Sequence, residues 1–214
     1  ADTTNSVVEL APLARTVQRT INIGQVNPHA HWMSHDGTTM VTANAFTADS
    51  TIFDFPSNSI ARIVPSGALP IATGMMPDAS KYYITNLLDS TITVVNTTTG
   101  EVLKTIDLLA NHDPIIGTIT GPVGALPIQT PVSPNGKSMV TANTLTGTIT
   151  VVDTRPGLST TDTVVAMLPC DSGCHGVQFG ATQGGGYYAY VASKFSNRLL
   201  VVDIHHRQGH AAPL

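Results

Sequence analysis

Short runs of alternating apolar and polar residues cover most of this chain, and each run ends in residues that favour turns. Segment 148–153, for example, places Ile and Val between threonines and ends on an aspartate. Alternation with a period of two predicts β-strands, because successive side chains of a strand point to opposite faces of the sheet. Asp36-Gly37 and Asn135-Gly136 are turn dipeptides that join such strands into hairpins.

The strand pattern recurs four times. Segment 77–96 matches segment 134–153 closely, and looser copies occupy 35–54 and 185–203. A period of this length, built from short strands and Asx or Gly turns, is typical of a β-propeller blade. We therefore predict an all-β fold, a β-propeller of four-stranded antiparallel blades, with about four blades between residues 10 and 204.

Each repeat predicts four strands and begins, in sequence order, with the outer one. The predicted outer strands are 16–23, 58–64, 101–108 and 160–168. A loop leads from each to a predicted innermost strand, and these are 29–34, 71–76, 128–133 and 175–180. The interval before the third inner strand is the longest, which indicates an insertion after residue 108. Insertions in propellers fall in loops and often form binding surfaces.

Several short motifs connect these repeats to a known family. Tyr83-Ile84-Thr85-Asn86, the turn 133–137 and the Val-Val-Asp endings at 151–153 and 201–203 resemble the YVTN family of β-propeller repeats, over nearly the whole chain. The resemblance implies a propeller, usually a ring of about seven blades, on a fold that hosts many activities. With four blades, the chain is expected to be a fragment, to close as a small ring, or to complete its ring with a second copy or another chain.

The same pattern divides the chain into two parts. Residues 1–204 are predicted to form the propeller. The last segment, 205–214, contains His205, His206 and His210 and lacks the pattern of a blade, so we expect a flexible tail with at most adventitious metal binding.

Composition and charge narrow the class of protein. A net charge of −4 provides no basic footprint for nucleic acid. No apolar run approaches the roughly 20 residues that span a bilayer, so no transmembrane segment is expected. The sequence starts at Ala1 without a methionine, which is typical of a chain after signal-peptide removal and also of a proteolytic product. We expect a periplasmic or secreted protein.

The two cysteines, Cys170 and Cys174, lie close together and directly precede His175. In an exported protein this spacing favours a small-loop disulfide. The run also resembles a haem c attachment motif with one extra residue, and a metal–thiolate site is the third reading. Haem is the least favoured cofactor, because the usual spacing between the two cysteines is one residue shorter.

Histidines stand out when the inner strands are aligned. His29 and His175 occupy the position of Ile71 and Ile128, and His31 lies on the same face as His29. Because innermost strands line the central channel, we expect His29, His31 and His175 to converge there. His112, in the insertion, is a fourth candidate ligand. Imidazole suits copper and zinc, and copper is the favoured metal in an exported protein.

Three functions remain open, and the sequence does not decide whether the chain is an enzyme. The first is a metal-binding propeller that forms the propeller part of a copper redox enzyme; the resemblance implies kinship with periplasmic propellers such as nitrous oxide reductase and the propeller nitrite reductases. No cupredoxin ligand set is present. The second is a non-catalytic scaffold that binds a protein, glycan or surface. The third is a zinc hydrolase with Asp113 or Asp171 as general base.

Overall fold

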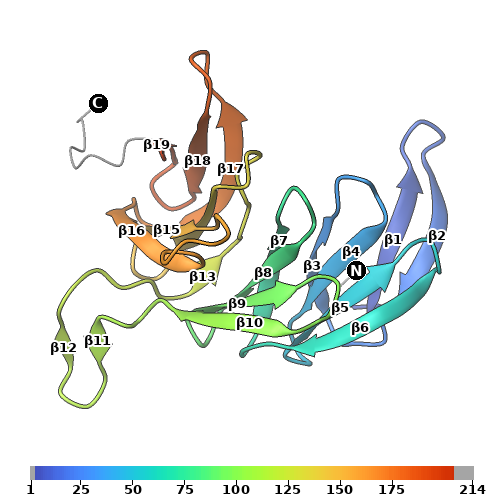
Figure 1. The fold of residues 1–214 in the computed structure, drawn as a ribbon, viewed down its shortest axis with the longest axis horizontal. Helices are drawn as coiled ribbons and strands as arrows, with labels where there is room; N and C mark the ends of the chain where they lie inside the picture. Colours follow the sequence, from blue (N-terminus) through green and yellow to red (C-terminus); the bar gives the residue numbers. More distant parts are fainter. Residues whose placement is uncertain (1–2, 205–214) are drawn as a thin grey trace.

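The computed structural model describes residues 3–204, in which the regular elements are all strands (Figure 1). Three complete antiparallel sheets of four strands form the middle of the molecule. Blade one contains β3 (Pro28–Met33), β4 (Thr39–Asn44), β5 (Asp49–Asp54) and β6 (Ser59–Pro65). Blade two contains β7 (Pro70–Met75), β8 (Lys81–Asn86), β9 (Thr91–Asn96) and β10 (Val102–Asp107). Blade three contains β13 (Pro127–Ile128), β14 (Ser138–Asn143), β15 (Thr148–Asp153) and β16 (Thr163–Pro169).

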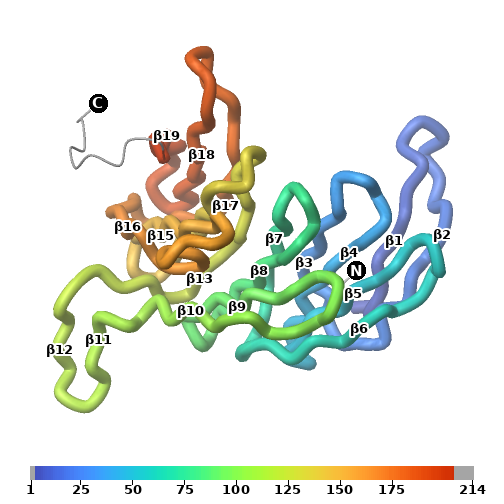
Figure 2. The backbone as a smooth tube through the Cα atoms, viewed as in Figure 1, coloured from blue at the N-terminus to red at the C-terminus, as the bar shows by residue number. Residues whose placement is uncertain are grey.

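Smaller sheets lie at the two ends of this series. At the N-terminal end, β1 (Ser6–Ala11) pairs with β2 (Thr16–Asn22). Blade four has three strands in the described part of the chain, β17 (Cys174–Ala181), β18 (Tyr187–Ser193) and β19 (Arg198–Asp203). The sheets follow one another in an open arc from the N-terminus to the C-terminus (Figure 2). The predicted all-β propeller of four-stranded antiparallel blades is confirmed as the fold class.

The order of strands within a blade differs from the sequence unit. The outer strand is the last strand of its sheet, because β6 pairs with β5 and β10 pairs with β9. A tight turn joins each such pair, so the outer strand folds back on the strand before it. The sequence unit and the sheet are therefore offset by one strand. The predicted strand 16–23 pairs with β1, which the sequence pattern did not predict.

Blade three departs most from the prediction. Its inner strand was predicted at 128–133, but β13 covers only Pro127–Ile128, followed by one isolated bridge between Val132 and Met139. Gln129 adopts a left-handed φ of 65°, and Pro131 has no N–H to donate to a sheet. These two residues interrupt the strand. The insertion forms a two-stranded hairpin of β11 (His112–Asp113) and β12 (Thr118–Ile119).

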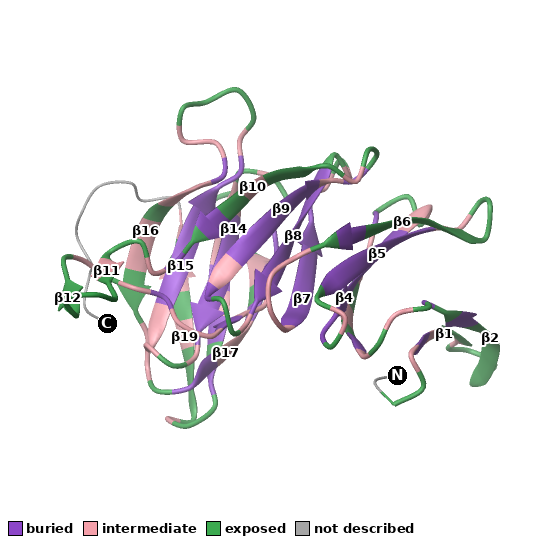
Figure 3. Ribbon diagram, turned by 90° about the horizontal axis from the view of Figure 1, so that it is seen from below, coloured by how far each residue is buried: buried purple, intermediate pink, exposed green. Residues whose placement is uncertain are grey.

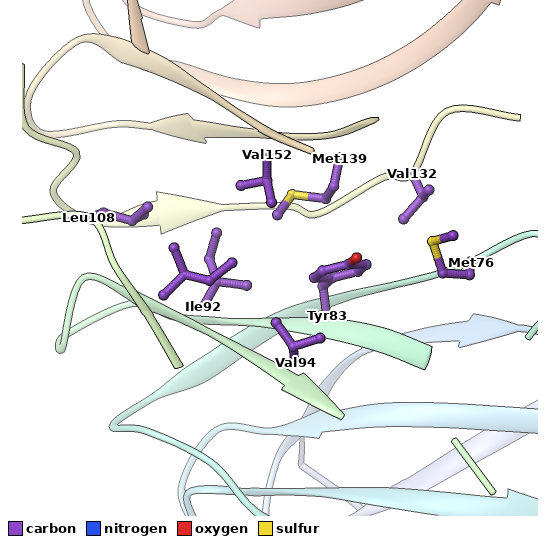
Figure 4. Packing of buried hydrophobic residues seen from close by; sticks show 9 residues of the cluster. Met76, Tyr83, Ile92, Val94, Leu108, Val132, Met139 and Val152 are labelled. Carbon is purple, nitrogen blue, oxygen red and sulfur yellow. The ribbon is translucent and has the colours of Figure 1, made fainter. Parts of the chain in front are cut away.

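The hydrophobic core lies between neighbouring sheets rather than inside any one of them. Four clusters of buried apolar side chains fill the successive interfaces from β1–β2 to blade four. In the cluster between blades two and three, Tyr83 and Val94 face Met139 and Val152 (Figure 4). Burial is concentrated in the central strands, whereas β2 and the β11–β12 hairpin are largely exposed (Figure 3). Each blade is therefore stabilised chiefly by its neighbours.

A buried asparagine closes the turn between the second and third strands of each complete blade. The Asn86 side-chain amide donates hydrogen bonds to the hydroxyl oxygens of Thr91 (2.9 Å) and Thr93 (2.8 Å). Asn143 does the same with Thr148 and Thr150, whereas Asn44 donates to the Asp49 carboxylate and the Thr51 hydroxyl. This arrangement, the asparagine clamp, gives the repeated Asn of the motif a structural role. The clamp is absent from blade four, where Ser193 occupies the position.

Candidate functional site

The inner strands bring His29 into a defined orientation. His29 is an exposed residue of β3, and its Nδ1 lies 2.8 Å from the backbone carbonyl oxygen of Ile71 in blade two. A carbonyl oxygen can only accept, so Nδ1 must carry the proton and donate. This contact leaves the Nε2 lone pair available to accept a hydrogen bond or bind a metal ion, the arrangement found in many metal-binding histidines.

His175 of blade four lies within electrostatic reach of His29. Partial burial lowers the pKa of His175 below its ordinary value, and electrostatic interactions with Lys194 and His29 lower it further. At neutral pH the His175 imidazole is therefore expected to be neutral. The fold thus brings together two predicted site residues that stand far apart in the sequence.

Gln129 is a residue of the inner edge that the sequence interpretation missed. Its side-chain oxygen accepts a hydrogen bond from the Val177 amide of blade four at 3.1 Å. The adjacent Thr130 hydroxyl donates to the Tyr83 carbonyl of blade two at 3.3 Å. The corresponding positions hold Ala30, Ala72 and Gly176 in the other blades. A long amide among small residues was the signal that could have identified Gln129.

The remaining predicted ligands are placed differently. His31 is exposed on β3, two residues beyond His29. His112 belongs to the β11–β12 hairpin, which projects away from the sheets (Figure 1). Asp113, a predicted general base, accepts hydrogen bonds from the amides of Ile115 and Ile116 in the same hairpin. Within residues 3–204, no three or more His, Cys, Asp or Glu side chains form a group that could hold a metal ion.

The positions of these residues do not test the prediction of a metal site. His29, His31, His175 and His112 stay predicted ligands, and copper and zinc stay predicted metals. The predicted tail, 205–214, with its three histidines, lies outside the described residues.

Both cysteines have free thiols in this structure. Cys174 is fully buried, and Cys170 packs against the same apolar cluster between blades three and four. Burial, together with the interaction with the neighbouring Cys170 side chain, raises the pKa of Cys174 to about 12. The Cys170 sulfur also lies 3.6 Å from the Ser193 hydroxyl.

A second candidate site is an arc of exposed apolar side chains on the turns between the second and third strands of the blades. Each of the four residues stands two positions after the asparagine of the clamp or, in blade four, after Ser193. Their exposed fractions are high: Phe46 70%, Leu88 64%, Leu145 70% and Phe195 68%. We call this set the apolar arc. A large apolar residue that recurs exposed at one repeat position contributes little to the core, so its presence calls for another explanation.

Backbone hydrogen bonds hold three members of the apolar arc in equivalent places. The amide of Phe46 donates to the Val26 carbonyl at 3.3 Å, and Leu88 donates to Ala68 at 3.2 Å. Leu145 donates to Ala125 at 3.2 Å, in the segment that leads out of the insertion. The face that carries the arc therefore includes the segments that lead into the inner strands, at Val26, Ala68 and Ala125.

The four turns that carry the apolar arc contain few charges. The four turns, 45–48, 87–90, 144–147 and 194–197, contain one carboxylate, Asp89, and one ammonium group, Lys194. The Asp89 carboxylate already accepts the Ala68 amide at 2.6 Å. These four turns are therefore apolar and close to neutral.

The first and last sheets of the series also expose apolar faces. Leu10 and Val17 are cross-strand partners on β1 and β2, and both are exposed. Leu199 and Val201 are exposed on β19, while the alternating Leu200 and Val202 pack against the core of blade four. In the middle of the molecule such faces are covered by the next blade.

Comparisons with known proteins support the fold alone. No family model matches the chain, and no curated protein matches it. Among solved structures, the chain is similar to Kuenenia stuttgartiensis hydrazine synthase, with 21% sequence identity and a TM-score of 0.59 over 82% of this chain. The match covers 49% of that protein, so this chain spans about half its length. Residues 3–204 contain no helix long and apolar enough to cross a membrane.

Proposed function

We propose that this propeller is a non-catalytic binding module that docks another protein on the apolar arc. The observation that carries the proposal is the recurrence of an exposed Phe or Leu at one turn position in all four blades. Equivalent positions of a propeller lie side by side around one face, so these four side chains present a common surface. Exposed apolar patches of this kind mark interaction sites.

The chemistry of the surface defines the partner. With one carboxylate and one ammonium group on the four turns, the arc complements a surface that is itself apolar and nearly uncharged. An anionic lipid surface would instead favour clustered Lys and Arg beside the apolar residues. The proposed partner is therefore a folded protein with an apolar patch.

Photo-crosslinking can test the docking proposal. A photoreactive residue at position 46 or 88 should crosslink one partner in the native source, whereas the same residue at Ile63 or Leu103 on the outer strands should not. With that partner purified, the Leu88→Ser/Leu145→Ser variant should bind at least about tenfold more weakly than the unaltered chain.

The matched control is Ile63→Thr/Leu103→Thr, which removes two exposed apolar side chains from the outer strands and should leave the affinity unchanged. Equal losses in both variants, or crosslinking chiefly from the outer strands, would contradict docking on the apolar arc.

A metal site at His29 and His175 is the second candidate, and the orientation of His29 favours it. The hydrogen bond from Nδ1 to the Ile71 carbonyl leaves Nε2 free, and His175 stands at the equivalent position of blade four. Two imidazoles would leave positions open for water or an exogenous ligand. Copper(II) binds such nitrogen ligands more tightly than zinc, so copper is the metal we propose.

Metal analysis can test this candidate on a background variant that lacks the tail histidines, His205→Ala/His206→Ala/His210→Ala. After dialysis against Cu(II), this variant should retain about one equivalent. His29→Ala or His175→Ala should lose it, and His35→Ala, at an exposed turn, should retain it. A background variant without stoichiometric metal, or equal losses in all three, would rule the site out.

Three further expectations stand as proposals beside these two. They are the assignment of the repeats to the YVTN type, an exported location, and completion of the ring by a second chain or a second copy. The motif Tyr83-Ile84-Thr85-Asn86 supports the first. The apolar faces exposed on the two terminal sheets, β1–β2 and blade four, support the third.

A further inference from the structure

Blade four lacks every part of the asparagine clamp. Where the other blades have Asn44, Asn86 and Asn143, blade four has Ser193. The residues that accept from those asparagines are replaced as well, by Arg198 and Leu200. Among the residues that the structure describes, no equivalent pair of side-chain hydrogen bonds therefore holds the turn between β18 and β19.

The residue opposite the clamp differs too. In the complete blades the cross-strand partner of the asparagine is a proline, Pro28, Pro70 or Pro127. In blade four the partner of Ser193 is Cys174. A proline fixes the backbone at the start of the inner strand, and blade four has lost that constraint along with the clamp.

The two cysteines gather at this point. Cys174 is fully buried, and Cys170 lies with its sulfur 3.6 Å from the hydroxyl of Ser193, the cross-strand neighbour of Cys174. Both belong to one cluster between blades three and four. Gly173 has a φ of 74°, a left-handed conformation that turns the short loop between the cysteines back toward the sheet.

We propose that Cys170 and Cys174 form an intramolecular disulfide that fastens the start of blade four, in place of the missing asparagine clamp and proline. The loop that it closes includes Gly173, whose carbonyl accepts the Lys194 amide at 3.0 Å. The disulfide would thus fix the inner strand β17 and the turn that carries Phe195 relative to each other.

The chemistry is thiol–disulfide exchange with a disulfide oxidant, for which oxidised glutathione serves as the probe. Cys170 is partly exposed, so its thiolate attacks one glutathione sulfur and releases the other as a thiol. Cys174 then attacks the mixed disulfide and releases the second glutathione. Two S–H bonds are lost, one S–S bond forms in the protein, and two electrons with two protons reduce the glutathione disulfide. Burial and the raised pKa of Cys174 agree with its acting second.

Redox equilibration of the unaltered chain can test the proposal. In oxidising glutathione buffer, alkylation and intact mass should show both thiols protected in a monomeric chain. The oxidised form should have a Tm about 5 °C above the reduced form. Amide exchange should slow in β17 and β18 but not in β8, because only blade four is fastened by the disulfide.

Cys170→Ser/Cys174→Ser should unfold at the Tm of the reduced chain and should not respond to the buffer. Free thiols after equilibration, interchain disulfides, or a disulfide that leaves both the Tm and the exchange of β17 and β18 unchanged would each overturn the proposal. The comparison of oxidised and reduced unaltered chain needs no variant, so it holds even if the double variant does not fold.

Discussion

Replacing Asp162 by alanine should destabilise the chain by about 3–5 kcal/mol, the largest effect that we expect from a single side chain. Both carboxylate oxygens of Asp162 lie 2.7 Å from the Lys81 ammonium nitrogen, and one accepts the Tyr83 hydroxyl at 2.6 Å. All three side chains are buried between blades two and three. Burial and the nearby Asp162 charge raise the pKa of Tyr83, so its hydroxyl stays protonated and donates.

The physical reason is the charge that the substitution leaves behind. Without Asp162, the Lys81 ammonium group would stay buried with no counter-charge, and the Tyr83 hydroxyl would lose its acceptor. Urea unfolding of the two proteins measures the loss. The matched control is Asp171→Ala, which breaks the exposed pair with Arg198 at 3.3 Å and should change stability by less than about 1 kcal/mol.

A second variant separates the charge effect from general damage to the interface. Adding Lys81→Met to Asp162→Ala removes both charges and should recover much of the lost stability, because the double variant leaves no unpaired charge buried between the blades. If the double variant is as unstable as Asp162→Ala alone, the ion pair does not account for the effect.

Replacing Gly74 by alanine should destabilise the chain by about 3 kcal/mol, through the contact between blades two and three. A Cβ at position 74 would lie 1.7 Å from the carbonyl oxygen of Thr130 and 2.6 Å from its carbonyl carbon. Both are backbone atoms, so no side-chain rotation can relieve the clash. The inner strand β7 would have to separate from blade three, which would also loosen the packing of Met76 against Val132 seen in Figure 4.

Gly176→Ala is the matched control, because it adds the same methyl group to another inner strand, β17. Its Cβ would lie 3.7 Å from the Cβ of Ala192, an ordinary contact, so we expect a change within roughly 0.5 kcal/mol. Thermal unfolding of both variants measures the difference. Similar stabilities for Gly74→Ala and the unaltered chain would show that the blades can move apart at little cost.

Turn-favouring residues and the alternation of apolar and polar side chains predicted most of the strands, because both act over a few neighbouring residues. The strands β4, β8 and β14 lie where the repeated motif placed them, and the turns at Asp36-Gly37 and Asn135-Gly136 join consecutive strands. Local alternation failed in blade three, where Gln129 and Pro131 interrupt the inner strand. It also missed β1, which pairs with the outer strand β2 as β5 pairs with β6, but whose sequence lacks the repeated motif.

The candidate sites were predictable only in part. Alignment of the repeats identified His29 and His175 as anomalous, and the structure places them within electrostatic reach of each other. His112 was added as a fourth candidate from the insertion, outside that alignment, and the insertion folds into a hairpin of its own. The apolar arc could have been found by the same alignment, because its four residues share one repeat position; only their exposure shows that they do not belong to the core.

By itself, the sequence determined the all-β class, the repeat and the residue types at each blade position, since these follow from side-chain alternation and turn preference. The tertiary structure decided which strands share a sheet. The local sequence of β6 is compatible with pairing to β5 or to β7, and only the folded chain shows that it pairs with β5. It also decided that Lys81 meets Asp162 and that Gly74 meets Thr130, because these contacts arise where one blade packs on the next. Such contacts depend on the geometry of packed sheets, which no local pattern records.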